Sequence, residues 1–140
     1  METQSTSAAP TDPTVQVTVG VYTHRDLHVA VAVDQQGRWL GTRGFPTTPA
    51  GFAALTTWAI RYGTLGSIGI QGTGRYGAGL ARWLRARGHV VIEVERPERR
   101  DRQGRRRRGK SDPTDAEAAA RAVLAGTAVG QPKAADGGSR

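Results

Sequence analysis

Alternating apolar and polar residues in the first third of the chain predict three short strands. Valines recur at every second position from 15 to 21, which favours a strand that ends near Tyr22. Residues 28–34 alternate in the same way, and a tight turn at 35–37 leads into residues 38–45. Because short turns join these three segments, we expect an antiparallel meander.

Helical and strand patterns then alternate. Thr48, followed by proline, is expected to cap a helix that ends at Gly63. A short β-branched run at 67–71 predicts a fourth strand. The spacing of apolar residues over about 77–87 predicts a second helix, and residues 89–95 are predicted to form a fifth strand.

A final helix is expected in the alanine-rich stretch that starts at Asp112. We expect Asp112 as its N-cap, Pro113 at its first position, Asp115 in its first turn and Gly126 as its terminator. Three strands, then two strands each reached across a helix, then a terminal helix is the element order of the ribonuclease-H-like fold. The sequence therefore predicts an α/β domain over residues 15–126, with a five-stranded mixed sheet and flanking helices.

The two ends of the chain differ in composition from this domain. Residues 1–14 are polar and rich in Pro, Thr and Ser, and residues 127–140 are linker-like, so both are predicted to be disordered. The first segment lacks the basic and apolar regions of a signal peptide, and no apolar run is long enough to span a bilayer. The chain has no cysteine, which excludes disulfides and thiolate metal sites. These features predict a cytoplasmic protein without a membrane partner.

Positive charge is concentrated in one segment. The net charge is +8, and nine basic residues against two acidic ones place +7 of it within residues 96–110. Such a block predicts a polyanionic partner, most simply nucleic acid, with a solvated linker as the alternative. The expected nucleic acid-binding residues are Arg99, Arg100, Arg102, Arg105, Arg106, Arg107, Arg108 and Lys110.

A glycine-rich turn at 72–77 follows the fourth predicted strand. A strand, a turn and a helix in this order often build a site at the strand's C-terminal end, so Gln71 is expected to point into it. The turn also matches G-x-G-x-x-G, with Glu93 and Glu95 about 20 residues further on, which keeps a dinucleotide-binding domain as an alternative. The three preceding meander strands argue against that alternative. Residues 104–111 match a P-loop, but no predicted strand leads directly into them.

Asp112 and Asp115 lie three residues apart, on one face of the first turn of the last helix. Hard carboxylate oxygens of this kind suit Mg²⁺ or Mn²⁺, and a pair of such ions can promote phosphodiester chemistry. The alternative is that both aspartates only cap the helix and favour its dipole.

Three ordered motifs carry a resemblance to a known family. Residues 20–28, 69–77 and 109–116 are similar to the N-terminal domain of bacterial insertion-sequence transposases of the IS-one-ten type, and the resemblance extends from residue 19 to 126. These are DEDD transposases with a RuvC-like, ribonuclease-H-fold domain. The resemblance implies DNA transposition and recombination, DNA binding, Mg²⁺ (or Mn²⁺) as cofactor, a structured guide RNA, and self-association or a full-length transposase as partner.

The four acidic metal ligands that the family implies are only half present. Asp112 and Asp115 match, whereas the aspartate that ends the first strand falls on Tyr22 and the glutamate before the glycine turn falls on Gln71. We therefore expect weak or lost metal binding. Family members also continue into a domain with a catalytic serine, which does not follow within these 140 residues. We expect a truncated N-terminal fragment that is inactive alone.

Two other ligand sets remain open. Asp26 or Asp34 could replace a missing carboxylate, and His24, Asp26 and His28 could form a separate metal site. Against the second possibility, turn histidines are usually solvent-facing or hydrogen-bonded.

Overall fold

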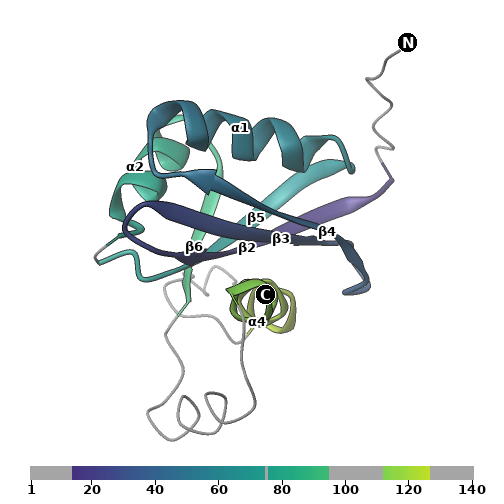
Figure 1. Cartoon of the computed structure of the whole chain (residues 1–140). Coiled ribbons are helices and arrows are strands. Elements are labelled where there is room, and N and C mark those ends of the chain that lie inside the picture. Colours follow the sequence, from purple (N-terminus) through teal and green to yellow (C-terminus); the bar gives the residue numbers. More distant parts are fainter. Residues whose placement is uncertain (1–13, 75, 95–111, 127–140) are drawn as a thin grey trace, which may run out of the picture.

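The computed structural model describes residues 14–74, 76–94 and 112–126, which form one mixed sheet with helices on both faces (Figure 1). Its elements are β2 (Gln16–Thr23), β3 (Leu27–Val33), β4 (Trp39–Pro46), α1 (Pro49–Ile60), β5 (Thr64–Gln71), α2 (Ala78–Ala86), β6 (Val90–Val94) and α4 (Asp112–Ala125).

The five strands lie in the order β4-β3-β2-β5-β6. The pairs β2–β3 and β3–β4 are antiparallel, as predicted for the meander, whereas β5 pairs in parallel with both β2 and β6. The predicted five-stranded mixed sheet is confirmed, and the arrangement is the ribonuclease-H-like one. Because β2, β5 and β6 run in parallel, their carboxyl ends meet at one edge of the sheet.

The two faces of the sheet are covered differently. Helices α1 and α2 lie on one face and α4 on the other, where it packs against β2, β3 and β5 (Figure 1). The α1–α2 side holds the larger core cluster. Its largest fully buried side chains include Leu55, Ile68, Ile70, Leu80 and Leu84.

Helix α4 approaches the sheet backbone very closely. A Cβ atom on Gly20 of β2 would overlap the Ala116 carbonyl oxygen and the Ala120 nitrogen of α4. One on Gly69 of β5 would lie 2.5 Å from a methyl group of Val123. Only glycine permits this backbone approach, so these two positions fix how α4 lies across the sheet.

Most predicted element boundaries hold to within a residue or two. Thr48 caps α1 by accepting a hydrogen bond from the Gly51 nitrogen at 3.0 Å, and Gly126 follows α4 with a positive φ of 75°. Two expectations were wrong. β5 begins at Thr64 rather than at 67, because its first residues still pair with β2. Asp112 is the first residue of α4 rather than its N-cap.

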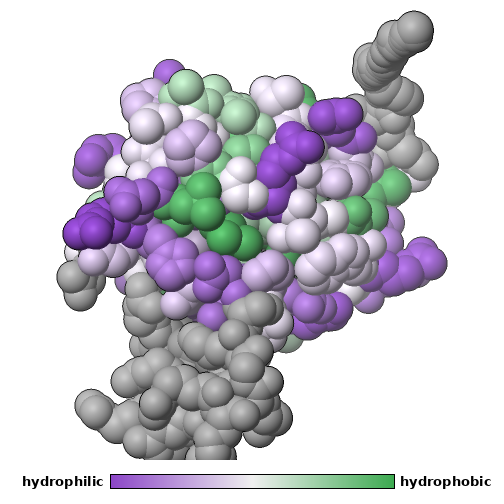
Figure 2. Space-filling view, viewed as in Figure 1, coloured by the Kyte–Doolittle hydropathy of each residue, from purple (hydrophilic) through white to green (hydrophobic). Residues whose placement is uncertain are grey.

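The outer surface is mixed in character. Figure 2 shows a small hydrophobic patch near the centre of this face, with hydrophilic residues on either side of it. Most residues of the edge strand β4 are exposed, Arg43 among them, and charge on an edge strand opposes pairing with another sheet. No helix within the described ranges is both long and apolar enough to cross a membrane.

Candidate functional site

The candidate site lies at the edge where β2 and β5 end. The last paired residues of these two strands are Val21 and Ile70, so Tyr22 and Gln71 come one step further along. Side chains alternate between the faces of a strand. Since Gly20 and Gly69 face α4, Tyr22 and Gln71 two residues later face α4 as well.

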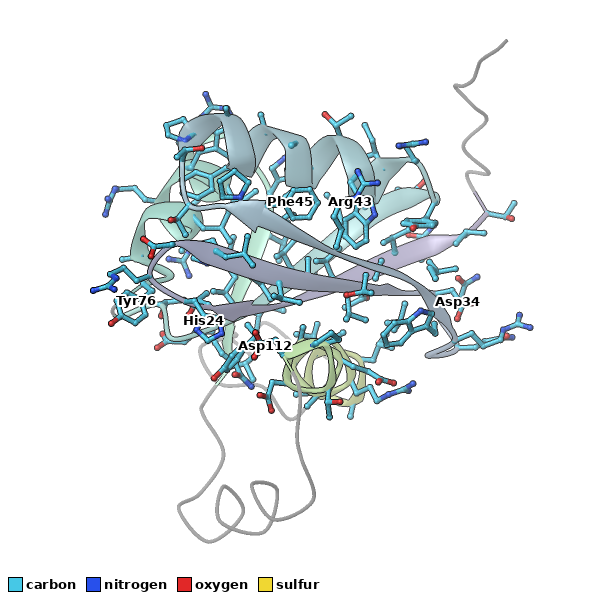
Figure 3. The ribbon with its side chains drawn as sticks, viewed as in Figure 1. His24, Asp34, Arg43, Phe45, Tyr76 and Asp112 are labelled. Atoms are coloured by element: carbon cyan, nitrogen blue, oxygen red, sulfur yellow. The ribbon has the colours of Figure 1, made fainter. Side chains whose placement is uncertain are left out.

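The first turn of α4 meets the same edge. The His24 Nε2 atom lies 3.0 Å from the Asp112 Oδ2 atom, and Ala116 lies against Gly20 one helical turn further on. The path of β2 from Gly20 to His24 therefore runs toward the N-terminus of α4. Figure 3 shows His24 and Asp112 side by side at this end of the sheet. The structure thus gathers the four positions that the family resemblance singled out.

Gln71 supplies a buried acceptor to this site. Its side chain is 2% exposed, and its Oε1 atom has no hydrogen-bond partner among the described residues. The backbone is held separately, because the Thr23 hydroxyl donates to the Gln71 carbonyl oxygen at 2.8 Å. A buried unpaired carbonyl costs about 1–3 kcal/mol, so this amide is better suited to a site with a ligand than to a closed core.

Asp115 and Tyr22 are the other two of the four positions at this end of the sheet, besides Gln71 and Asp112. Asp115 is 2% exposed and makes contacts within the structure, so a carboxylate is buried beside the sheet. Tyr22 is half-buried, packs against the small cluster that contains Ala116, and meets the His24 ring edge-on at a centroid distance of 4.8 Å. At the position where the resemblance implies an acid, Tyr22 thus presents an aromatic ring and a phenol.

These side chains do not fit a pair of divalent cations. Two carboxylates carry at most two negative charges against the four positive charges of two Mg²⁺ or Mn²⁺ ions, and Asp112 is already engaged by His24. Gln71 and Tyr22 offer only neutral oxygens. The described ranges contain no group of three or more His, Asp or Glu side chains that could hold a metal. The site departs from the two-metal arrangement that the resemblance implies.

The aspartates considered as replacements lie elsewhere. Asp34 is in the turn after β3, at the opposite end of the sheet from His24 and Asp112 (Figure 3). Backbone N–H groups of Arg38 and Gln36 donate to its carboxylate, and chiefly the Arg38 bond lowers the pKa of Asp34. Asp26 is exposed and lies 3.7 Å from the Arg25 guanidinium. Neither lies within the four-position site.

The separate histidine site is also not formed, and the expectation for His28 was wrong. His28 is neither solvent-facing nor hydrogen-bonded within the described structure: it is 1% exposed and stacks with Phe52 of α1 at 6.1 Å. Burial, with a smaller contribution from His24, lowers the pKa of His28 to about 4. His28 thus faces α1 whereas His24 contacts α4, so the sheet separates them.

Sequence reasoning missed the role of His24. It follows Tyr22 by two residues, so a continued strand alternation would have placed both on the α4 face. Only the fold shows that Asp112, 88 residues later, lies beside it.

The predicted arginine-rich nucleic acid-binding segment lies outside the described residues. Its starting point is nevertheless fixed by the sheet, because Val94 of β6 pairs with Gln71 and the chain continues from Val94 toward residues 96–110. The covalent chain therefore leaves β6 beside the candidate site.

Comparison with known proteins gives one family match. The model of the DEDD transposase family of the IS-one-ten (IS110) type matches residues 19–136. No curated protein matches the chain.

Among solved structures, the chain is similar to the large terminase nuclease from thermophilic phage G20c, with 17% identity, a TM-score of 0.47, and coverage of 60% of this chain and 46% of that one. A ROK family transcriptional regulator, a homolog of the E. coli MLC protein, gives 13% identity, a TM-score of 0.41 and coverage of 59% and 28%. The ethanolamine utilization protein EutJ from Carboxydothermus hydrogenoformans gives 15% identity and a TM-score of 0.40, with coverage of 73% of this chain and 43% of that one. The chain spans less than half the length of each of these proteins.

Proposed function

Because the chain belongs to the DEDD transposase family of the IS-one-ten type, we propose that it serves DNA transposition as a nucleic acid-binding domain that does not cut or join strands by itself. One observation carries the second half of this proposal. The two strand ends that face α4 present Tyr22 and Gln71 where the family has acids.

The loss of two carboxylates changes the electrostatics of the site. Mg²⁺ gives up its bound water reluctantly, and its binding depends on anionic oxygens that offset its charge. A phenol and an amide do not supply that charge, and the pairing with His24 further reduces what Asp112 offers. We therefore assign Asp112 and Asp115 as the remaining acidic residues of a site that holds divalent metal weakly or not at all.

Features beside this site support nucleic acid binding. A pocket of about 390 Å³ is lined by His24, Arg25, Asp26, Leu27 and Tyr76. The residue Tyr76 is 40% exposed, and the side chain of Arg25 is 78% exposed. An aromatic ring can stack on a base while a guanidinium pairs with a phosphate. With the arginine-rich segment added, we propose that DNA, and a structured guide RNA, bind across this edge.

The remaining partners and boundaries belong to the same proposal. A further copy of a transposase would provide the chemistry that this domain lacks, with residues 15–126 as the folded unit. A non-catalytic RNA- or DNA-binding module is the second candidate function. The positive charge of residues 96–110 favours it as much as it favours the transposition function. The dinucleotide alternative gains no support from the sheet, because β2, β3 and β4 are antiparallel rather than doubly wound.

Calorimetric titration of Mn²⁺ tests the proposal. We expect no measurable heat from the natural protein, and binding by the double variant Tyr22→Asp, Gln71→Glu, because the variant restores four carboxylates. The matched control is Tyr22→Asn, which leaves amides at both strand ends and should behave like the natural protein.

Comparable Mn²⁺ binding by the natural protein and the double variant would overturn the weak-metal assignment. Metal-dependent strand transfer by the natural chain would overturn the claim that it does not act alone. If the double variant also fails to bind while circular dichroism shows it folded, the four positions do not form a metal site, and the assignment of Asp112 and Asp115 fails.

A further inference from the structure

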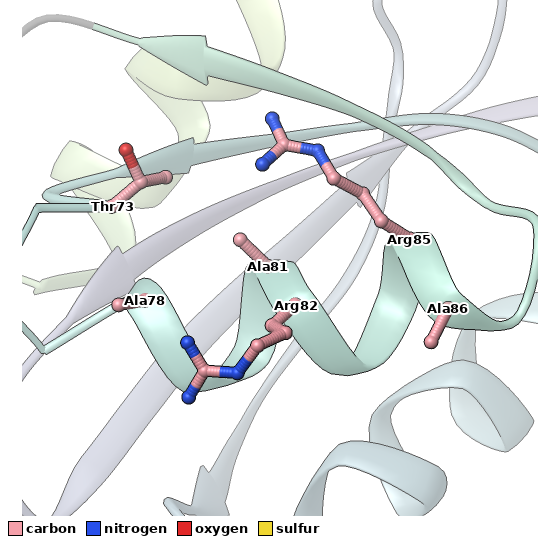
Figure 4. A pocket seen from close by; sticks show the side chains of 6 residues that line it. All are labelled: Thr73, Ala78, Ala81, Arg82, Arg85 and Ala86. Carbon is pink, nitrogen blue, oxygen red and sulfur yellow. The ribbon is translucent and has the colours of Figure 1, made fainter.

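A second basic site lies on α2, away from the α4 side of the sheet. A pocket of about 590 Å³ is lined by Thr73, Ala78, Ala81, Arg82, Arg85 and Ala86. Figure 4 shows the Arg85 side chain extending toward the strands and that of Arg82 toward the Ala78 end of the helix, with Thr73 across from them. Nothing in the four-position site uses these residues.

The lining favours an anion. Both arginines are exposed, and no hydrogen bond or ion pair from the described residues holds either guanidinium. Helix α2 carries no acidic residue in its nine positions. The three alanines are small and leave the space between the two guanidiniums and the Thr73 hydroxyl open. Guanidinium N–H donors match the oxygens of phosphate particularly well.

The same lining argues for the backbone of a polymer rather than for a nucleotide. None of the six residues is aromatic or acidic, so the pocket offers neither a stacking surface for a base nor a carboxylate for a ribose. Trp83, the nearest candidate for stacking, is covered by Arg87, whose guanidinium lies 3.9 Å from the centre of the ring. What remains is contact with phosphates, which carries no sequence information.

The position of the pocket connects it to the candidate site. Thr73 follows Gln71 by two residues, in the turn after β5, and Gln71 pairs with Val94, from which the chain continues toward the arginine-rich segment. A nucleic acid strand that leaves the sheet edge near Thr73 can therefore follow α2 past Arg82 and Arg85.

We infer that Arg82, Arg85 and Thr73 bind the phosphodiester backbone of a nucleic acid strand that crosses the sheet edge. This inference rests on the proposed function, which places nucleic acid at that edge. It adds a second contact surface on α2, distinct from residues 96–110.

Fluorescence anisotropy with a labelled single-stranded DNA of about 30 nucleotides, and with RNA of the same sequence, tests the inference. The variant Arg82→Ala, Arg85→Ala should bind both about tenfold more weakly. Its slope of log affinity against log salt should become shallower by about 1.4, since each phosphate contact on a single strand contributes about 0.7.

The matched control is Arg43→Ala, Arg61→Ala. It also removes two positive charges, but from exposed arginines that line another pocket, between β4 and α1. Its affinity should change less than about twofold, because distant charges are screened at physiological salt. Arg82→Lys, Arg85→Lys keeps the charges and should restore the salt slope and part of the affinity, which separates loss of binding from misfolding.

Several results would overturn the inference. Equal losses in the α2 variant and the control would show a general charge effect. Displacement of the oligonucleotide by low millimolar inorganic phosphate, with a phosphate affinity that depends on Arg82 and Arg85, would assign the pocket to a free phosphate. If alanine at residues 105–108 abolishes binding while the α2 variant binds normally, this inference fails and the proposed function stands. If the natural chain binds no oligonucleotide, both this inference and the proposed function fail.

Discussion

The two faces of the sheet are built on different principles. Toward α1 and α2, large side chains such as Leu55, Leu80 and Leu84 fill a thick apolar layer. Toward α4, the buried cluster is smaller, with valines of β3 beside alanines of the helix, and Gly20 of β2 lies directly against the backbone of Ala116. The first face holds the domain together through buried area, and the second places one helix at a fixed short distance from the sheet.

This difference follows from what each face has to position. An apolar layer tolerates modest rearrangement as long as its volume is conserved. A helix in backbone contact with a strand has no such freedom, and the N-terminus of α4 carries Asp112 and Asp115 to the ends of β2 and β5. Close packing on the α4 face therefore determines the geometry of the candidate site.

The largest expected effect comes from adding one methyl group to the α4 face. Gly20→Ala should lower the free energy of unfolding by about 3–4 kcal/mol, because its Cβ would overlap backbone atoms that cannot move without shifting α4. Urea unfolding followed by circular dichroism measures the change.

The same substitution on the other face provides the control. Gly79 lies within α2, and a Cβ there would meet only the Phe52 ring, at 3.8 Å. Because Gly79 is the second residue of α2, Gly79→Ala should stabilise the protein by no more than about 0.5 kcal/mol, less than in a helix interior. Equal effects of the two substitutions would show that α4 is not held in close backbone contact.

Removing volume from the α1–α2 face should cost slightly less. Leu84 is fully buried in the large cluster, so Leu84→Ala should lower the free energy of unfolding by about 3 kcal/mol. Leu124→Ala makes the same change on α4, where the side chain is 38% exposed, and should cost less than about 1 kcal/mol. A larger loss at Leu124 than at Leu84 would contradict the assignment of the main core to the α1–α2 face.

A third test uses pH and the buried histidine of the α1–α2 face. Because the pKa of His28 is lowered from 6.5 to about 4 in the folded state, the unfolded chain binds more protons between these values. Stability should therefore fall as the pH is lowered from about 6.5 toward 4, by about 2 kcal/mol from this residue. Urea midpoints measured across this range give the slope.

His28→Leu is the matched variant, since it removes the titrating group and keeps an apolar side chain of similar size. Its stability should vary less between pH 6.5 and pH 4 than that of the natural protein. An unchanged slope would mean that other groups control the acid sensitivity, and that His28 is protonated without cost in the fold.

The strands, helices and their order could be predicted from the sequence because each depends on local patterns. Alternating valines define β2, and Thr48 with the proline behind it defines the start of α1. The length of β5 could not be predicted, because its first residues are strand only through pairing with Gln16 and its neighbours on β2. The buried state of His28 was missed for a similar reason, since Phe52 covers it from a helix 24 residues away.

The candidate site was predictable only in part. The family motifs identified the four positions, and the observed sheet brings β2, β5 and α4, the elements that carry these positions, to one edge. Their roles in metal and DNA binding remain predictions. Neither the partner of Asp112 nor the Arg82–Arg85 pocket could be foreseen, because both depend on how α4 and α2 lie against the sheet.

The smallest expected effect concerns the contact between His24 and Asp112 at the site edge. Both side chains are nearly half exposed, at 43% and 45%, so their 3.0 Å contact is strongly screened by solvent. A double-mutant cycle with His24→Ala and Asp112→Ala should give a coupling energy below about 1 kcal/mol, far less than the cost of Gly20→Ala. Coupling above about 2 kcal/mol would mean that this pair, rather than the glycine contacts, holds α4 in place. In that case the edge would be a structural joint, and restoring carboxylates at Tyr22 and Gln71 would not be enough to rebuild a metal site.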